Sequence, residues 1–146
     1  FNIKNMFRNL KINDYNNNYL DLLNQLTDVN KDEISFNEFK LFLDNLDNNH
    51  IIQVIELNNK IVASGTLLIE NKIIHKFGKV GHIEDIVVDE NERGLGLGKK
   101  IIDHLTKLAK DAGCYKSILN CNESNIKFYQ KCGYNKKEVE MVKYFN

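Results

Sequence analysis

Three glycines alternate in the stretch RGLGLG, residues 93–98, directly before a strongly amphipathic run. Glycine is the poorest ordinary helix former, so a helix that opens in this way loses stability. The preceding HIEDIVVD, residues 82–89, has the pattern of a strand, which places the glycines on a strand-to-helix turn. Such a turn points free backbone N–H groups at one spot beside the positive end of the helix. The pattern favours a phosphate-binding loop over a turn that needs glycine for its geometry alone.

The glycine spacing differs from the two best-known phosphate-binding loops. A P-loop requires GxxxxGK[ST], but Gly94, Gly96 and Gly98 lie too close together, and a lysine follows Lys99 where Ser or Thr is needed. In the dinucleotide fingerprint GxGxxG, the third glycine comes one residue later than it does here. What remains is an R-x-x-G-x-G pattern that begins at Arg93.

Two adjacent carboxylates, Glu84 and Asp85, interrupt the apolar alternation of the strand upstream of this loop. Neighbouring strand residues point to opposite faces of a sheet unless a bulge intervenes, and bulges are common at active sites. Two interpretations stay open. The pair either acts on a substrate beside IVV, residues 86–88, or forms a solvated edge or a salt bridge.

Composition argues against several classes of function. Twenty basic and 20 acidic side chains cancel, so no overall field favours nucleic acid or an anionic membrane. The longest apolar runs are too short to span a bilayer, and we see no basic-then-apolar leader at Phe1. We expect one domain over residues 1–146 and a cytoplasmic protein.

The three cysteines, Cys114, Cys121 and Cys132, are an odd number without CxxC spacing. This argues against a disulfide framework or a zinc site, and we expect reduced thiols and no metal. Each cysteine is expected to pack as a small buried hydrophobic residue.

Periodicity predicts helices first, then a meander of strands, then alternating strands and helices, which together favour a mixed α/β sheet with helices on its faces. Ser35 precedes Glu38 by three residues, as in a capping box, and Asn58 with Asn59 suits a hairpin turn. Gly113 is expected to end the helix that follows the glycine loop. The expected helices are NNYLDLLNQLTDV, SFNEFKLFLDNL, the run after the glycine loop and ESNIKFYQKCG, and the expected strands are IIQVIEL, KIVASGTLLIE, KVGHIEDIVVDE, YKSILNC and VEMVKYF.

The R-x-x-G-x-G loop after a strand resembles the pyrophosphate loop of the GNAT superfamily of N-acetyltransferases, which has the form Q/R-x-x-G-x-G/A. The resemblance implies the GNAT fold, an α/β (α+β) arrangement with a central mixed, mostly antiparallel twisted sheet flanked by helices. Five segments resemble one branch, the glucosamine-6-phosphate N-acetyltransferases, with GHIEDIVV and GCYK the most specific. They are LTDV (26–29), GTLLIENKIIH (65–75), GHIEDIVVDENERGLGLGKK (81–100), GCYKSILNC (113–121) and NIKFYQKCGY (125–134).

This branch implies acetyl-CoA as cosubstrate and direct attack by the 2-amino group of D-glucosamine 6-phosphate, in UDP-N-acetylglucosamine biosynthesis. Direct attack needs no covalent enzyme intermediate, so the cysteines are not required as nucleophiles. The amides of residues 94–99 are expected to hold the pyrophosphate, and the end of the preceding strand is expected to hold the pantetheine arm. The implied cofactor contacts are Ile86, Val87, Val88, Arg93, Gly94, Leu95, Gly96, Leu97, Gly98, Lys99, Asn120 and Tyr129.

The resemblance also assigns roles in catalysis. Tyr129 matches the family tyrosine that faces the departing sulfur, as an acid or a stabiliser of the thiolate. Glu84 and Asp85 are implied to contact the amino sugar, and Glu84 to receive the amine proton through water. The implied substrate contacts are Thr27, Lys72, Ile73, Ile74, His75, Glu84, Asp85, Ile86, Tyr115, Lys116 and Tyr144.

Two positions depart from the branch. Asn120 stands where the family has an acidic residue, and Tyr144, beside Lys143, stands where an arginine binds the sugar phosphate. Two other functions therefore stay open: acetyl transfer to a protein or small amine, and a degenerate acyl-CoA sensor. KIIH and YK favour a closed basic pocket for a sugar phosphate. The branch also implies a homodimer with sites near the interface.

Overall fold

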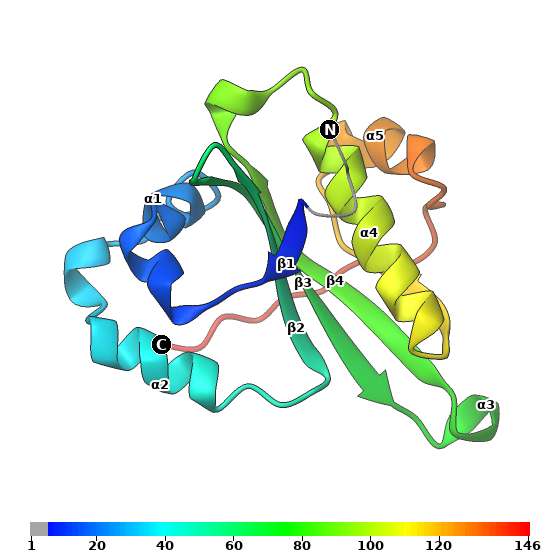
Figure 1. Ribbon diagram of the computed structural model, residues 1–146. Helices are drawn as coiled ribbons and strands as arrows, with labels where there is room; N and C mark the ends of the chain where they lie inside the picture. The colour runs from blue at the N-terminus through cyan, green and yellow to red at the C-terminus, as the bar shows by residue number, and fades with distance from the viewer. Residues whose placement is uncertain (1–5) are drawn as a thin grey trace.

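The computed structural model describes residues 6–146 as a five-stranded sheet with helices on both faces (Figure 1). Helices α4 and α5 lie on one side of the sheet, and α1 and α2 lie on the other. The strands are β1 (Phe7–Asn9), β2 (His50–Leu57), β3 (Lys60–Asn71), β4 (Lys79–Val88) and β5 (Cys114–Ile118). The helices are α1 (Tyr19–Leu23), α2 (Phe36–Asp44), α3 (Ile74–Phe77), α4 (Leu97–Asp111) and α5 (Ile126–Lys131).

The strands follow one another across the sheet in the order of the sequence. Each pair from β1 to β4 is antiparallel, whereas β4 and β5 are parallel, because α4 carries the chain back along the sheet. The expected mixed, mostly antiparallel sheet is therefore confirmed. Within residues 6–146, every helix is too short or too polar to cross a membrane.

Each face of the sheet has its own apolar core. On one face, α4 buries Ile101, Ile102 and Leu105 completely against β3 and β4. On the other face, α1 and α2 pack Leu22 and Phe39 against the sheet. The site described below lies where β4 passes between these two cores.

The local signals of the sequence are confirmed. Glu38 donates its backbone N–H to Ser35 Oγ over 3.1 Å, and Ser35 N–H donates to Glu38 Oε2 over 2.7 Å, which completes the capping box of α2. Asn58 and Asn59 have φ of 51° and 63°, as a tight hairpin turn requires. Gly113, at φ 90°, follows the end of α4.

Three expectations were wrong. VEMVKYF, residues 139–145, forms no strand, because no strand of residues 6–146 pairs with its backbone. The N-terminal third begins with β1, and α1 ends at Leu23, well before the expected Val29. Cys121 is exposed, although all three cysteines are free as expected.

A buried carboxylate anchors the segment that leads into the glycine loop. Asp89 is 1% exposed, accepts the Asn91 N–H at 3.0 Å and pairs with Lys60 Nζ at 3.0 Å. The Asn91 N–H and Lys60 lower the pKa of Asp89, so the carboxylate stays charged. The next residue, Glu90, donates its N–H to Gln25 Oε1 over 2.9 Å. These bonds tie the start of the loop to the β2–β3 hairpin and to the segment after α1.

Candidate active site

Strand β4 contains the bulge that the adjacent carboxylates suggested. Thr66 of β3 pairs with Glu84, but Ser64 pairs with Val87, so β4 carries one extra residue opposite Gly65. Asp85 has φ 52°, in the left-handed region that a residue with a side chain seldom adopts.

The bulge reverses the alternation of β4. Ile83 belongs to the core under α4, and so does Ile86, three residues later, while Val87 packs under α1. Without an extra residue, Ile83 and Ile86 would point to opposite faces. Glu84 and Asp85 are both exposed as a result, between two buried flanks.

Strands β4 and β5 separate next to this bulge. Their parallel pairing runs only from Lys79 and Cys114 to His82 and Ile118, whereas β4 continues to Val88. In the described part of the chain, the edge of Ile86, Val87 and Val88 that faces β5 pairs with no strand. Backbone N–H and C=O groups seek hydrogen-bond partners, so this edge is suited to an extended amide-bearing ligand.

The glycine loop reaches α4 with two residues in conformations that favour glycine. Gly94 has φ 92°, and Gly96, which caps α4, has φ 71°. A Cβ added at either glycine would meet no atom within 4 Å, so the space in front of the loop is open. Lys100 N–H donates to the Gly96 carbonyl, so the amides before it stand at the free N-terminus of the 15-residue helix.

Cationic side chains surround this loop. Arg93 is exposed and, within residues 6–146, makes no hydrogen bond or ion pair with a side chain. Lys100 Nζ donates to the Leu95 carbonyl over 3.2 Å, and Lys99 pairs with Asp103 at 2.5 Å. Free amides, open space and positive charge together fit a pyrophosphate group.

Tyr129 lies on α5, which packs beside the N-terminus of α4 (Figure 1). A Cβ at Gly98 would stand 3.3 Å from Phe128 Cζ, so the glycine lets α5 approach the loop. Tyr129 is half-buried, and burial, ahead of the nearby Cys121 and Cys132, raises the pKa of its hydroxyl. The hydroxyl therefore stays protonated at neutral pH and is available as a hydrogen-bond donor.

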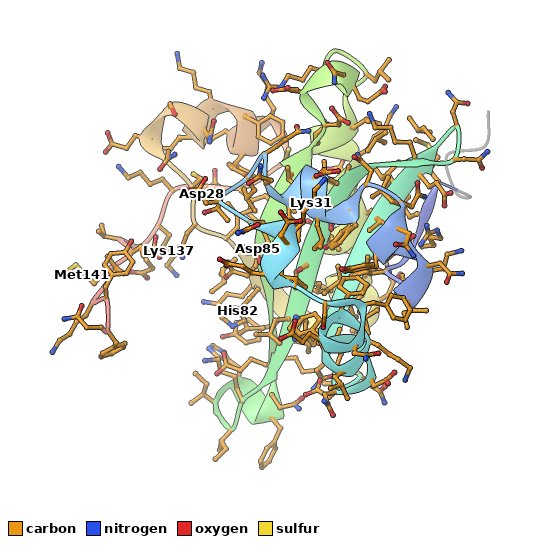
Figure 2. All side chains as sticks on the ribbon, turned by 90° about the vertical axis from the view of Figure 1, so that its left-hand side faces the viewer. Asp28, Lys31, His82, Asp85, Lys137 and Met141 are labelled. Carbon is orange, nitrogen blue, oxygen red and sulfur yellow. The ribbon has the colours of Figure 1, made fainter. Side chains whose placement is uncertain are left out.

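Glu84 has an increased affinity for a proton. Although Glu84 is exposed overall, partial desolvation of its carboxylate raises its pKa most, Asp85 and Glu140 raise it further, and His82 opposes them. His82 donates from Nε2 to Glu70 Oε1 over 3.0 Å, and Lys72 Nζ contacts the same Glu70 oxygen at 3.2 Å. Figure 2 shows His82 and Asp85 along β4, with Lys137 and Met141 of the C-terminal segment standing away from the body.

Several residues expected at the substrate form a separate group, the tip cluster of His75, Tyr115 and Lys116. The His75 and Tyr115 rings lie 4.3 Å apart, and Lys116 Nζ is 5.7 Å from the Tyr115 ring. The cluster lies beside α3, at the end of the β3–β4 hairpin that Figure 1 shows far from α5. Lys116 pairs with Val80, and the four residues of extended chain from Val80 to Glu84 span about 13 Å. Within one chain, the tip cluster therefore does not touch the bulge.

The remaining predicted residues are exposed. Ile73 and Ile74, next to the tip cluster, are 81% and 60% exposed. Thr27 lies after α1, and Asn120 follows β5. Tyr144 is 86% exposed in the C-terminal segment. Their predicted contacts with cofactor and substrate stay predictions.

Sequence reasoning missed two features that shape the site. It did not anticipate the separation of β4 from β5, which depends on pairing between distant segments. It also did not single out Gly65, which lies opposite the bulge. A signal was present, because an isolated glycine within a strand pattern often marks a bulge or a close approach.

Comparison with known proteins identifies the same architecture. Residues 13–134 match the acetyltransferase (GNAT) family. The chain is 44% identical to a glucosamine 6-phosphate N-acetyltransferase 1 of Dictyostelium discoideum over 94% of this chain and 89% of that protein. It is also 44% identical to a Candida albicans glucosamine 6-phosphate N-acetyltransferase, over 93% of both.

A solved structure is similar along almost its whole length. The crystal structure of glucosamine-6-phosphate N-acetyltransferase from Arabidopsis thaliana superposes with a TM-score of 0.91 and 41% sequence identity. The match covers 96% of this chain and 97% of the other. With a matching family model over most of its length and relatives above 40% identity, this chain belongs to the acetyltransferase (GNAT) family.

Proposed function

We propose that this protein is a glucosamine 6-phosphate N-acetyltransferase, which transfers the acetyl group of acetyl-CoA to the 2-amino group of D-glucosamine 6-phosphate. The products are N-acetyl-D-glucosamine 6-phosphate and CoA, formed in the cytoplasm for UDP-N-acetylglucosamine biosynthesis, by one domain over residues 1–146. The observation that carries the proposal is the unpaired edge of β4, which lies between the bulge and the open glycine loop. The full-length similarity to relatives of that name supports the acceptor.

Acetyl-CoA supplies the activated acetyl thioester, and the chain holds it through backbone groups. The amides of residues 94–99 bind the pyrophosphate, with Arg93 and Lys99 beside them. Ile86, Val87 and Val88 offer the unpaired strand edge to the pantetheine amides. An N–H group of this edge that faces the thioester oxygen stabilises the negative charge of the transition state, by about 3 kcal/mol for a single donor.

Two side chains act as proton acceptor and hydrogen-bond donor in the proposed reaction. Glu84, whose pKa is raised, receives the proton that leaves the attacking amine, through water. Tyr129, which stays protonated, donates a hydrogen bond to the leaving sulfur. Asn120 has an amide in place of a carboxylate, so it cannot be the general base. Its proposed role is a contact with the cofactor.

We also propose a homodimer. Large apolar side chains lie exposed on the C-terminal segment, and Tyr144 and Lys143 of this segment are candidates for the sugar phosphate. A second copy would bring another tip cluster toward the bulge, which one chain does not do. The exposed apolar residues of the segment are Val139, Met141, Val142, Tyr144 and Phe145.

The substrate is tested by measuring release of free thiol from acetyl-CoA with glucosamine 6-phosphate, glucosamine or a lysine peptide as acceptor. We expect rapid release with the phosphorylated sugar alone, because the proposed phosphate contacts, which include Lys143, favour an acceptor that carries a phosphate. Release with the peptide alone would keep the fold and cofactor but reject this acceptor. Tight acetyl-CoA binding without release from any acceptor would indicate a sensor.

Gly96→Ala should weaken acetyl-CoA binding about tenfold, or about 1.4 kcal/mol, because the methyl group enters the open space before the loop. Gly113→Ala is the matched control, since this glycine also has positive φ and open surroundings but lies at the other end of α4. Both variants should lose about 1 kcal/mol of stability through left-handed strain. Equal acetyl-CoA affinity of the two variants in calorimetry would exclude the glycine loop as the pyrophosphate-binding site.

Tyr129→Phe should lower kcat about 10- to 100-fold and leave both KM values within about threefold, as the loss of a proton donor predicts. Tyr134→Phe is the control, because Tyr134 hydroxyl bonds Thr106 Oγ1 at 2.6 Å and Ser117 Oγ at 2.7 Å, a structural role. Because the pKa of Tyr129 is raised, wild-type kcat should not fall between pH 7 and pH 9 through loss of this proton. An unaltered kcat in Tyr129→Phe removes the residue from the mechanism.

Met141→Asp should shift the protein from dimer to monomer in sedimentation equilibrium, because it places a charge in the proposed apolar interface. Leu41→Asp is the control, since Leu41 is also exposed, at 59%, but lies on α2. A dimer that withstands Met141→Asp, or a wild type that sediments as a monomer, would exclude this interface.

A further inference from the structure

Gly65 of β3 lies directly across from the bulge of β4. The register passes from Ser64 paired with Val87 to Thr66 paired with Glu84, which leaves Gly65 opposite Asp85 and Ile86. Gly65 is not among the glycines with positive φ, so its backbone conformation is open to any residue. The reason for a glycine at this position is therefore space, not conformation.

The space that a side chain would need at Gly65 is already filled. An added Cβ would stand 2.6 Å from Ile86 Cδ1, 2.8 Å from Leu105 Cδ1 and 3.2 Å from Ile101 Cγ1. The first two distances are shorter than real Cβ contacts allow, so a neighbour would have to move. Ile86 thus packs into the core through the volume that Gly65 leaves free.

Of the three neighbours, Ile86 has the most freedom to move. Ile101 and Leu105 on α4 are 0% exposed and packed on all sides, whereas Ile86 is only half-buried and follows the bulged residue. A side chain at position 65 would therefore push Ile86 outward and disturb the backbone of Asp85 and Ile86.

Strand β3 itself is held in place from its other face. The hydroxyls of Tyr19 and Ser64 are hydrogen-bonded at 3.0 Å, and both residues are buried. Burial raises the pKa of Tyr19 to about 12, so this bond keeps its proton at neutral pH. Since Ser64 precedes Gly65, the strand cannot move away from α4 to make room for a larger residue without breaking this bond.

We propose that Gly65 is a positioning residue for acetyl transfer: its missing side chain lets Ile86 enter the core and thereby fixes the bulge that aims Glu84, Asp85 and the free edge of β4 at the reacting groups. Gly65 touches no reactant in this role and acts through Ile86. The inference rests on the proposed function for its catalytic readout, while the position of the bulge can be measured without any acceptor.

The test compares Gly65→Ala with Gly65→Ala/Ile86→Val, which removes Ile86 Cδ1, the closest atom to the added methyl. We expect Gly65→Ala to lower kcat at least about tenfold, because small misplacements at a site have effects of this size, with acetyl-CoA affinity within about threefold. The double variant should recover most of this loss relative to Ile86→Val alone.

Gly81→Ala is the matched control. A Cβ at Gly81 would stand 2.9 Å from Ala109 Cβ and 3.1 Å from Leu67 Cδ1, so this strand glycine is also crowded under α4, somewhat less than Gly65, and lies before the bulge. It should lower the melting temperature as Gly65→Ala does and leave kcat within about twofold. If Gly81→Ala and Gly65→Ala lower kcat equally, the effect of Gly65 is one of general core packing, and the proposal is overturned.

Amide resonances of Asp85 and Ile86 give the readout that does not depend on the acceptor. Gly65→Ala should shift both, and the added Ile86→Val should return them toward their positions in Ile86→Val alone. Unmoved resonances, or a kcat of Gly65→Ala within twofold of wild type, would overturn the inference. If Gly65→Ala does not fold, the double variant is compared with Ile86→Val alone. A kcat of the double variant about tenfold below that of Ile86→Val would contradict the proposed rescue. If wild type acetylates no sugar phosphate, the proposed function fails, but the resonances still decide the role of Gly65.

Discussion

The left-handed backbone at Asp85 is the constraint on which the arrangement of the site depends. A residue with a side chain in this conformation costs about 1–3 kcal/mol, so the surrounding structure must hold it there. The apolar neighbours provide that support, because Ile86 enters the core under α4 and Val87 enters the core under α1. Full burial of an apolar side chain contributes about 1.5–3 kcal/mol; Val87 gains this contribution and half-buried Ile86 gains part of it, which together offset the strain. A regular strand would bury one carboxylate of the pair and expose one of these apolar residues.

Glycines serve two distinct physical purposes around this strand. Gly94 and Gly96 have positive φ and open surroundings, so glycine supplies the loop conformation and leaves room for a ligand. Gly65 and Gly98 have crowded surroundings, where glycine lets Ile86 or Phe128 approach the backbone. The first kind shapes the surface that an anion meets, and the second kind sets the distances between the elements behind that surface. Substitutions at the two kinds should therefore affect binding and turnover differently.

The parts of the fold that follow from local chemistry were predictable from the sequence. The capping box at Ser35 and the glycine loop each depend on neighbouring residues, and the paired carboxylates suggested the bulge, although its position is set by pairing with β3. Features that depend on distant partners were not predictable. The three-residue β1 is a strand only because β2 pairs with it, and VEMVKYF is not one because it finds no partner strand among residues 6–146. The separation of β4 from β5 likewise depends on where their pairing stops.

Several residues expected to bind the acceptor are not brought to the bulge within one chain. The bulge, the loop and Tyr129 are held by β4, α4 and α5 of one chain, which carry most of the proposed cofactor contacts. Lys116 of the tip cluster pairs with Val80, about 13 Å from Glu84 along β4, so the cluster does not touch Glu84 of its own chain. Exposed Ile73 and Phe77 beside the tip, at 81% and 77%, have the apolar character of an interface core, as the C-terminal segment does. The homodimer proposed above would cover this apolar surface with a second copy.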